Sequence, residues 1–281
     1  MGFSRLVAIF IITSTLLLPI SHAAKQPIQI NIAAFDKNHL FREQGPIRQL
    51  LTEHVKTYLP QYQLAYVDTR FTEFWHSVQR QESICHVFAN PHISDLNTIK
   101  SKRATLLTPM PAVVMHNRSL KKLSSQNNAS AEAILQQEKF VGGYNAGRRY
   151  PTYLQQLIDD KISDRNSSLF GGHFTINQLH QHTNDGQLDY FIGLPQIMPT
   201  ISGISLNDFT IIPFEVQTPQ ALYFVCNDSP KHKTFLQHFD RTAFHWYHNA
   251  QFHQIWQLLF PLDTAKEFPL LNQFINQQMH D

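Results

Sequence analysis

Two adjacent arginines and the glycine before them have the clearest potential for chemistry in this sequence. Arg148 and Arg149 follow Gly147, and a proline two residues later suits the first turn of a helix. The start of a helix presents free backbone N–H groups and the positive end of the helix dipole, and both attract anions. A guanidinium adds paired hydrogen bonds to a carboxylate or a phosphate. The segment therefore predicts an anion site, unless the arginines face solvent or pair with Asp159 or Asp160.

The other candidate ligand-binding residues follow predicted strands. Open α/β sheets bind ligands beyond the carboxyl ends of their strands, so the residues just after each apolar run are the candidates. Together with the arginine segment, they give the predicted set Phe35, Asp36, Asn90, His92, Asn145, Gly147, Arg148, Arg149 and Gln196. Phe35, Tyr144 and Tyr150 could also stack on a ring, although core packing explains an aromatic residue equally well.

No pattern of a catalytic or cofactor site accompanies these residues. The sequence has no Gly-x-Ser-x-Gly elbow, no His-Glu-x-x-His zinc pair and no Gly-x-x-x-x-Gly-Lys phosphate loop. Cys85 and His86 are adjacent on a predicted strand, where consecutive side chains point to opposite faces. His238, His245 and His248 share a broad face of a predicted helix, but its many aromatic residues favour packing over metal binding. We therefore expect no catalytic residue, no metal and no cofactor.

The N-terminus has the three-part pattern of a secretory signal peptide. Met1–Arg5 carries one positive charge, Leu6–Ile20 is apolar, and Ser21 and Ala23 place small residues at positions −3 and −1 of a cleavage site. A membrane-spanning helix needs about 20 apolar residues, more than this run supplies. The alternative is an uncleaved N-terminal anchor. Residues 1–24 are thus the predicted signal peptide, and the periplasm is the predicted location.

Composition excludes some classes of function. The chain has 23 Lys and Arg against 21 Asp and Glu, so it lacks the dominant positive field of a nucleic-acid-binding protein. Hydrophobic residues make up 42% of the chain, which is enough for a folded core. Cys85 and Cys226 are its two cysteines. In an oxidising compartment such a pair can form a disulfide, and the alternative is two buried free thiols.

Alternating strands and helices must position the candidate residues. Residues 28–89 read as strand, helix, strand, helix and strand, which is typical of a mostly parallel sheet covered by helices. Residues 106–115 are apolar but broken by Pro109 and Pro111, which predicts an extended crossing segment. Further strands are predicted at 140–143, 188–192 and 221–226, with helices after Pro151, at 175–182 and over most of 233–260.

The order of these elements resembles that of the family 3 periplasmic solute-binding proteins, the two-lobed proteins that serve amino-acid transporters. The resemblance covers the mature chain and lies in diffuse patterns rather than in one sharp motif. It is carried by Ser83–Asn90, Lys100–Pro109, Phe140–Arg149, Leu179–Gly193 and Ala221–Asn227. The run from Gly147 to Tyr150 and the position of Cys85 are closest to a poorly characterised branch of secreted members.

The resemblance implies an α/β fold of two lobes, each a mostly parallel sheet with flanking helices, joined by a hinge of two strands. Lobe one is expected at 25–112 and 221–281, and lobe two at 113–220. In such a fold the returning strand lies antiparallel beside the third strand of lobe one. That arrangement would bring Cys226 next to Cys85, within the distance that a disulfide spans.

Two positions depart from the pattern of the family's amino-acid binders. The family usually carries an arginine before a phenylalanine–serine pair, and the nearest cations here are Lys100 and Arg103. It also carries an aspartate that holds the ammonium group of the ligand, and Leu194 stands at about that position. The resemblance with these departures therefore implies a solute other than an α-amino acid, and the residues favour an anionic or aromatic one.

The residues and the resemblance together imply a periplasmic, monomeric, non-enzymatic protein that closes two lobes on a small anionic or aromatic solute. The implied partners are that solute and a membrane permease or a sensor, without nucleic acid. One alternative is a secreted sensory or interaction module that kept the fold without a transport ligand. An enzyme on the same fold is another, because one fold hosts many functions.

Overall fold

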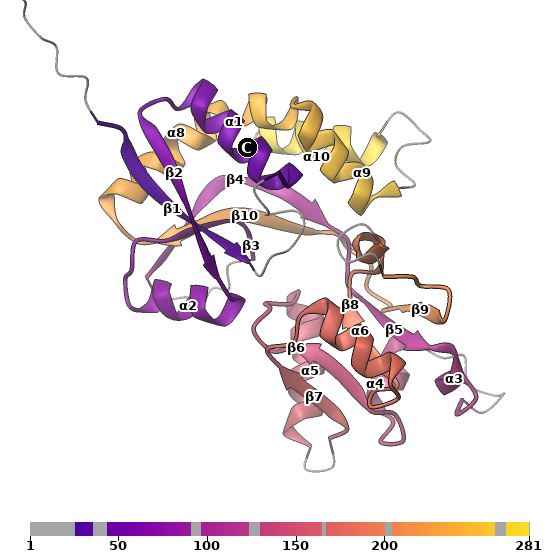
Figure 1. The fold of residues 1–281 in the computed structure, drawn as a ribbon. Helices are drawn as coiled ribbons and strands as arrows, with labels where there is room; N and C mark the ends of the chain where they lie inside the picture. Colours follow the sequence, from indigo (N-terminus) through magenta and orange to yellow (C-terminus); the bar gives the residue numbers. More distant parts are fainter. Residues whose placement is uncertain are drawn as a thin grey trace, which may run out of the picture.

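Two five-stranded sheets organise the chain, each with its own helices and apolar core (Figure 1). The computed structural model describes residues 26–35, 44–90, 97–123, 130–164, 167–199, 204–261 and 268–280. The predicted signal peptide, Asp36 and His92 lie outside these residues. We call the two bodies lobe one and lobe two, in the order in which the chain enters them.

Lobe one is built on a sheet with the strand order β2-β1-β3-β10-β4. Its strands are β1 (Ile28–Phe35), β2 (Tyr62–Thr69), β3 (Cys85–Ala89), β4 (Thr98–Thr108) and β10 (Gln220–Asn227). β1 runs parallel to β2 and β3, whereas β10 runs antiparallel to β3 and β4. Its helices are α1 (Pro46–Tyr58), α2 (Phe71–Gln79), α8 (Pro230–Tyr247), α9 (Ala250–Leu259) and α10 (Pro269–His280).

Helices cover both faces of this sheet. In Figure 1, α1, α8, α9 and α10 lie over one face and α2 lies against the other. α1 shows why the sequence folds this way: Leu50, Leu51 and Val55 recur at helical spacing and are buried against the sheet. Full burial of one such side chain contributes about 1.5–3 kcal/mol. The helix begins at Pro46 after an extended Gly45, as proline at the first helical position favours.

Lobe two is built on a sheet with the strand order β7-β6-β8-β5-β9. Its strands are β5 (Ala112–His116), β6 (Gly142–Asn145), β7 (Leu169–Gly172), β8 (Tyr190–Gly193) and β9 (Phe209–Pro213). Its helices are α3 (Asn117–Leu120), α4 (Ala131–Gln136), α5 (Thr152–Ser163), α6 (Ile176–Asn184) and the 3-10 helix η1 (Pro195–Ile197). β6 runs parallel to β7 and β8, and β5 runs antiparallel to β8 and β9.

The prediction of mostly parallel sheets holds for strand direction, because four of the five strands in each lobe run the same way. The exception is β10 in lobe one and β5 in lobe two, and each is the first strand after a crossing between the lobes. Residues 109–111 connect β4 to β5, and residues 214–219 connect β9 to β10. The first crossing is the extended segment that Pro109 and Pro111 predict.

The predicted disulfide is present. Cys226 of β10 lies directly opposite Cys85 of β3, and a Cys85–Cys226 bond joins the two strands. Both cysteines are fully buried in the core of lobe one. Among the described helices, none is both long enough and apolar enough to cross a membrane.

Candidate ligand-binding cleft

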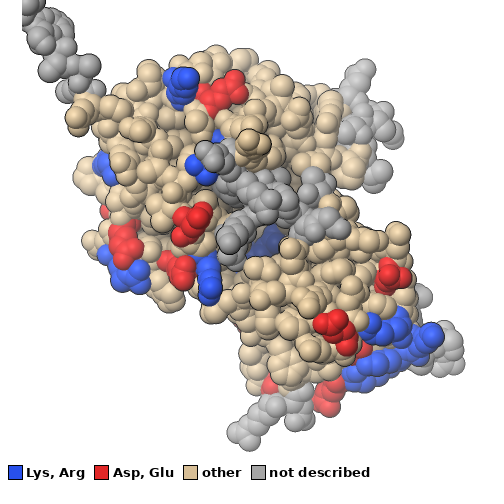
Figure 2. Space-filling view, in the orientation of Figure 1, with Lys and Arg blue, Asp and Glu red and all other residues tan. Residues whose placement is uncertain are grey.

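A cavity of about 550 Å³ lies between the two lobes, and residues of both line it. Figure 2 shows the space between the lobes hollowed, with blue atoms of Lys or Arg inside. Lobe one contributes the ends of β1 and β3 and the start of α2, and lobe two contributes the segment after β6 and the start of α6. The position matches the expected one, beyond the carboxyl ends of parallel strands. The volume is in the range of small-molecule sites.

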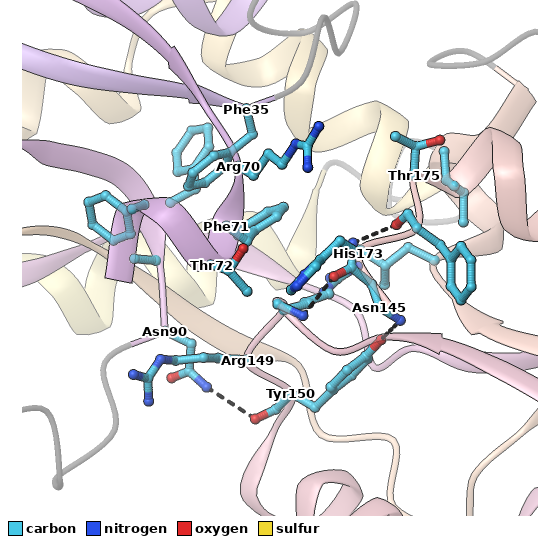
Figure 3. Close-up of a pocket in the computed structure, with 18 of the residues that line it drawn as sticks. Phe35, Arg70, Phe71, Thr72, Asn90, Asn145, Arg149, Tyr150, His173 and Thr175 are labelled. Atoms are coloured by element: carbon cyan, nitrogen blue, oxygen red, sulfur yellow. Dashed lines mark hydrogen bonds between the residues drawn. The ribbon is translucent and has the colours of Figure 1, made fainter. Parts of the chain in front are cut away.

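Aromatic rings form the wall that lobe one contributes. The ring of Phe35, at the end of β1, lies 3.9 Å from that of Phe71 and 4.0 Å from that of His86, between centroids. Figure 3 shows Phe35 and Phe71 side by side, with Arg70 beside them. Further rings in this wall come from Phe74, Trp75 and Phe88.

His86 is a neutral member of this wall. Its side chain is buried, and its Nδ1–H donates to the carbonyl of Ala33 at 3.1 Å. Burial lowers the pKa of His86 to about 3, against hydrogen bonds with the backbone of Ala33 and Phe88 that raise it. The imidazole is therefore uncharged at neutral pH and offers a ring rather than a cation.

Asn145 holds the arginine segment of lobe two in place. Its Nδ2 donates to the carbonyl of Phe174 at 2.7 Å, and its Oδ1 accepts from the backbone N–H of Gly147 at 2.9 Å. Its backbone N–H donates to the hydroxyl of Tyr150 at 3.2 Å. Figure 3 shows these bonds on the lower side of the cavity. Both side-chain groups of Asn145 are engaged, so this residue shapes the loop that carries Arg148.

Arg148 is a cation that lines the cavity without a carboxylate partner among the described residues. No carboxylate of the described residues forms an ion pair with its guanidinium, whose central carbon lies 5.8 Å from the centre of the Tyr150 ring. Burial lowers the pKa of Arg148, and the electrostatic interaction with Tyr150 raises it by less. Burial also raises the pKa of Tyr150 to about 12, so its hydroxyl keeps its proton at neutral pH. A partly desolvated guanidinium is left facing a cavity.

The charged groups of the lining are all positive within the described part of the chain. Arg70, Arg148 and Arg149 line the cavity, and none of the described lining residues is Asp or Glu. α2 and α6 both begin at the cavity, so the positive ends of two helix dipoles add to these charges. Trp75 contributes one more donor, because its buried indole N–H has no acceptor among the described residues. This arrangement favours a ligand rich in acceptors.

The cavity brings together most of the predicted ligand-binding residues. Phe35, Asn90, Asn145, Gly147, Arg148 and Arg149 line it. Asp36 and His92 lie outside the described residues. Gln196 is not among the lining residues: its side chain is exposed on η1, whereas Leu194 and Ile197 beside it line the cavity. Tyr144, a candidate for stacking, is also not among the lining residues, because it packs in the core of lobe two.

Other lining residues were missed by sequence reasoning. Arg70, Phe71, Thr72 and Trp75 come from the start of α2, which was predicted as a helix but not as a wall of the site. His173 follows β7, a strand of four residues that the sequence pattern did not predict. Lys100 and Arg103, the nearest cations to the family's arginine, lie away from the cavity, and the Lys100 ammonium sits 3.8 Å from the Tyr223 ring centre.

Comparisons with known proteins identify the fold. The sequence matches no family model and none of the curated proteins. A substrate-binding protein of an ABC uptake transporter from Streptococcus pneumoniae, with bound histidine, has a TM-score of 0.60 and 14% identity, over 83% of this chain and 92% of that one. A putative L-cystine ABC transporter protein from Listeria monocytogenes has a TM-score of 0.61 and 11% identity, over 83% and 95%. An arginine transport system periplasmic binding protein from Legionella pneumophila has a TM-score of 0.58 and 9% identity, over 83% of this chain and 100% of that one.

These similarities and the two sheets together establish the architecture. The chain has the two-lobed α/β fold of type II periplasmic binding proteins, as the order of its elements predicted. Identities of 9–14% carry the fold alone, so the ligand has to be argued from the cavity.

Proposed function

We propose that this protein binds a small organic anion with an aromatic body between its two lobes, without catalysing a reaction. The observation that carries the proposal is Arg148, a guanidinium without a described carboxylate partner that faces the cavity. A carboxylate or phosphate placed there would form charge-assisted, paired hydrogen bonds with it. Arg70 and the starts of α2 and α6 strengthen the positive potential at the same place.

The aromatic wall supports an aromatic body for the ligand. The rings of Phe35, Phe71 and His86 contact one another at the cavity, and Phe88 and Trp75 continue the surface. Aromatic rings pack well in offset or edge-to-face arrangements against other rings. A cavity of about 550 Å³ also has room for a ring together with an acidic group.

The lining favours an acid without an ammonium group. The solved relatives are named for histidine, cystine and arginine, which all carry an α-ammonium. In this chain Leu194, an apolar residue, lines the cavity where the resemblance implied an aspartate, and the described lining offers no carboxylate. An ammonium would be desolvated there next to three guanidinium groups.

The fold supports a role in delivery outside the cytoplasm. The printed descriptions of the solved relatives are of transporter substrate-binding proteins. We propose the same working arrangement here: residues 1–24 are a cleaved signal peptide, the mature chain is a monomer, and its partner is a membrane permease or a sensor.

A thermal-shift screen of residues 25–281 tests the proposal. Three probes isolate the chemical groups: 3-phenylpropionate has the ring and the carboxylate, phenylalanine adds the ammonium, and phenethylamine lacks the carboxylate. A ligand at 100 times its Kd adds about 2.7 kcal/mol to the free energy of unfolding. We expect aryl acids to raise the melting temperature, phenylalanine to raise it less, and phenethylamine to leave it unchanged.

Two outcomes contradict the proposal. Stabilisation by phenethylamine would show that the cavity selects cations. No stabilisation by any acid in a wide panel, including phosphorylated and aliphatic acids, would favour the secreted interaction module. In the same screen, Arg148→Ala should lose the stabilisation by aryl acids. Arg241→Ala, at an exposed arginine of α8 outside the cavity, is the matched control and should keep it.

A further inference from the structure

The arginine segment of lobe two also touches lobe one, and it does so at a glycine where a side chain would force its neighbours to shift. A Cβ atom added to Gly147 would lie 2.9 Å from Cγ2 of Thr72 and 3.2 Å from the backbone nitrogen of Thr72. The first distance is shorter than side-chain contacts in proteins, and the second is to backbone that cannot rotate away. Gly147 therefore allows the loop after β6 to pack directly on the first turn of α2.

A second contact joins the same loop to the same helix. The guanidinium carbon of Arg149 lies 3.9 Å from the centre of the Trp75 ring, within the range of a cation–π interaction. Thr72 and Trp75 are three residues apart in α2, so they share one face of that helix. That face receives both Gly147 and Arg149.

A third contact lies at the end of β3. The side-chain N–H of Asn90 donates to the backbone carbonyl of Tyr150 at 3.4 Å (Figure 3). Residues 147–150 thus contact lobe one through a close approach, a stacked cation and a hydrogen bond. Arg148 is in the middle of this segment and points into the cavity.

We infer that Gly147, Arg149 and Trp75 are positioning residues that hold the two lobes together and so fix Arg148 against the wall of lobe one. All three line the cavity, but the inference concerns their contact across the lobes: Gly147 packs on Thr72, and the Arg149 guanidinium lies over the ring of Trp75. The inference rests on the proposed function only where it concerns the ligand. The contact between the lobes is a property of the protein without ligand.

Electron–electron distance measurements on the protein without ligand test the contact directly. Spin labels on Lys56→Cys in α1 and Gln156→Cys in α5 report the separation of the lobes, because both positions are exposed and both native cysteines are in a disulfide. We expect Gly147→Ala to lengthen or broaden the distance distribution. Thr72→Ala alone should leave it unchanged.

The double variant is the decisive arm. Thr72→Ala removes the Cγ2 atom that a new Cβ would meet, so Gly147→Ala with Thr72→Ala should return most of the way to the wild-type distribution. A defect in folding would not be rescued in this way. Trp75→Ala should broaden the distribution, whereas Trp75→Phe, which keeps a ring under Arg149, should change it little. Unchanged distributions in both Gly147→Ala and Trp75→Ala would overturn the inference.

Binding of 3-phenylpropionate separates this inference from the proposed function. We expect Gly147→Ala to raise the Kd at least tenfold and the added Thr72→Ala to restore it. If wild type binds no acid while the distances respond as expected, the proposed ligand is wrong and the contact between the lobes stands. If Gly147→Ala opens the lobes but leaves the Kd unchanged, the positioning of Arg148 by this contact is wrong.

Discussion

At the scale of single residues, Arg148 is the side chain whose removal should matter most for binding. It faces the cavity without a carboxylate partner in the described chain, so a bound anion would be its main interaction. We expect Arg148→Ala to weaken binding of an aryl acid by about 2 kcal/mol, roughly 30-fold, as for a hydrogen bond to a charged group. Isothermal titration measures the change.

Arg148→Lys distinguishes charge from geometry. Lysine keeps the positive charge but not the planar pair of donors, so an intermediate loss of affinity is expected. Equal affinities for wild type and Arg148→Ala would remove this residue from the site.

Buried histidines make stability depend on pH. His54 is 1% exposed and packs against the rings of Phe239 and Trp246, and its Nε2 lies 2.9 Å from the hydroxyl of Thr242. Burial, with a smaller contribution from the charge of His245, lowers the pKa of His54 to about 4. The unfolded chain therefore takes up a proton between about pH 6.5 and 4 that the folded chain refuses.

Because the unfolded chain takes up this proton and the folded chain does not, acid favours unfolding. Above about pH 6.5 the buried His54 costs the folded protein no stability. As the pH drops toward 4, the free energy of unfolding falls by about 1.4 kcal/mol per pH unit for one such group. Urea unfolding between pH 7.5 and 5 should show a shallower dependence in His54→Gln than in wild type. The exposed His280→Gln is the control, and parallel slopes for all three proteins would contradict the prediction.

The residues of the site that the sequence predicted share one signal. The segment 145–149 is polar, contains a glycine and lies at the end of β6. The rule that ligands bind at the carboxyl ends of strands was therefore enough to find its residues Asn145, Gly147, Arg148 and Arg149. Trp75 gave no such signal. It is an aromatic residue inside an amphipathic helix, where packing in a core is the ordinary role, and only the second lobe makes it part of a wall.

At the scale of elements, a buried carboxylate ties β8 to the neighbouring segments of lobe two. Asp189 accepts hydrogen bonds from Ser119 Oγ at 2.6 Å, from Lys122 Nζ at 2.7 and 2.9 Å, and from the backbone N–H of Val141 at 2.9 Å. Burial raises the pKa of Asp189, but the bonds from Lys122, Ser119 and Val141 outweigh it and lower the pKa.

Removal of this carboxylate should destabilise lobe two. We expect Asp189→Ala to reduce the free energy of unfolding by about 2 kcal/mol, because the buried Ser119 hydroxyl and the Val141 N–H lose their acceptor, and Ser119→Ala by about 1 kcal/mol. Asp160→Ala, at an exposed position in α5, should change it by less than about 0.5 kcal/mol. Urea unfolding measures all three, and equal values for Asp189→Ala and Asp160→Ala would refute the role of Asp189.

The disulfide should stabilise lobe one through the long loop that it closes. Cys85 and Cys226 are 141 residues apart, so the bond restricts much of the unfolded chain. In the chain-entropy description a loop of this size contributes about 4–5 kcal/mol. Replacement of both cysteines by alanine should lower the free energy of unfolding by an amount of this order, measured by urea unfolding without reductant.

A chemical control accompanies this prediction. Iodoacetamide should modify neither cysteine in the denatured, unreduced wild-type protein and both after reduction, as read by intact mass. Modification without reduction would show that the two thiols are free.

Sequence patterns predicted the elements with a strong period and missed those whose pattern depends on partners. α1 has a clear apolar stripe, and it is the first of the two helices predicted within residues 28–89. β4 was not predicted over its first half, because Lys100, Lys102 and Arg103 interrupt the apolar pattern. In the fold, the backbone N–H groups of Lys102 and Arg103 donate to the carboxylate of Asp240, 137 or more residues away.

The break between α8 and α9 was missed because the sequence pattern continues across it. The sequence predicts helix over most of 233–260, whereas the structure has two helices separated at His248 and Asn249. The side chain of Asn249 caps α9 by accepting from the backbone N–H of Gln251 at 2.8 Å. The signal for a helix start was present, but continuous aromatic spacing on both sides outweighed it.

At the scale of the whole molecule, two short crossings connect the lobes, and both contain proline. Pro109 and Pro111 lie in the first crossing, and Pro219 lies directly before β10 in the second. Proline fixes φ near −65°, so each of these residues has one torsion fewer with which the lobes could rotate apart. We therefore expect the hinge and the contact of α2 with residues 147–149 to restrict one opening motion of the lobes.

This arrangement makes a prediction about how far the lobes open. With spin labels at Lys56→Cys and Gln156→Cys, the distance distribution of the protein without ligand should be narrow. Pro109→Ala with Pro111→Ala should broaden it, because alanine restores the freedom of two φ torsions. Pro230→Ala, at the first turn of α8 and outside both crossings, is the matched control and should leave the distribution unchanged.

The combination with Trp75→Ala separates the two restraints. If the hinge and the contact restrict one opening motion, either restraint alone still limits that motion. The hinge variant Pro109→Ala with Pro111→Ala should then broaden the distance distribution more in the Trp75→Ala background than in the wild-type background. A broadening that is the same in both backgrounds would mean that the crossings and the α2 contact control different motions. Aryl-acid affinity should then follow the contact alone, since Arg148 is carried by the segment that touches α2.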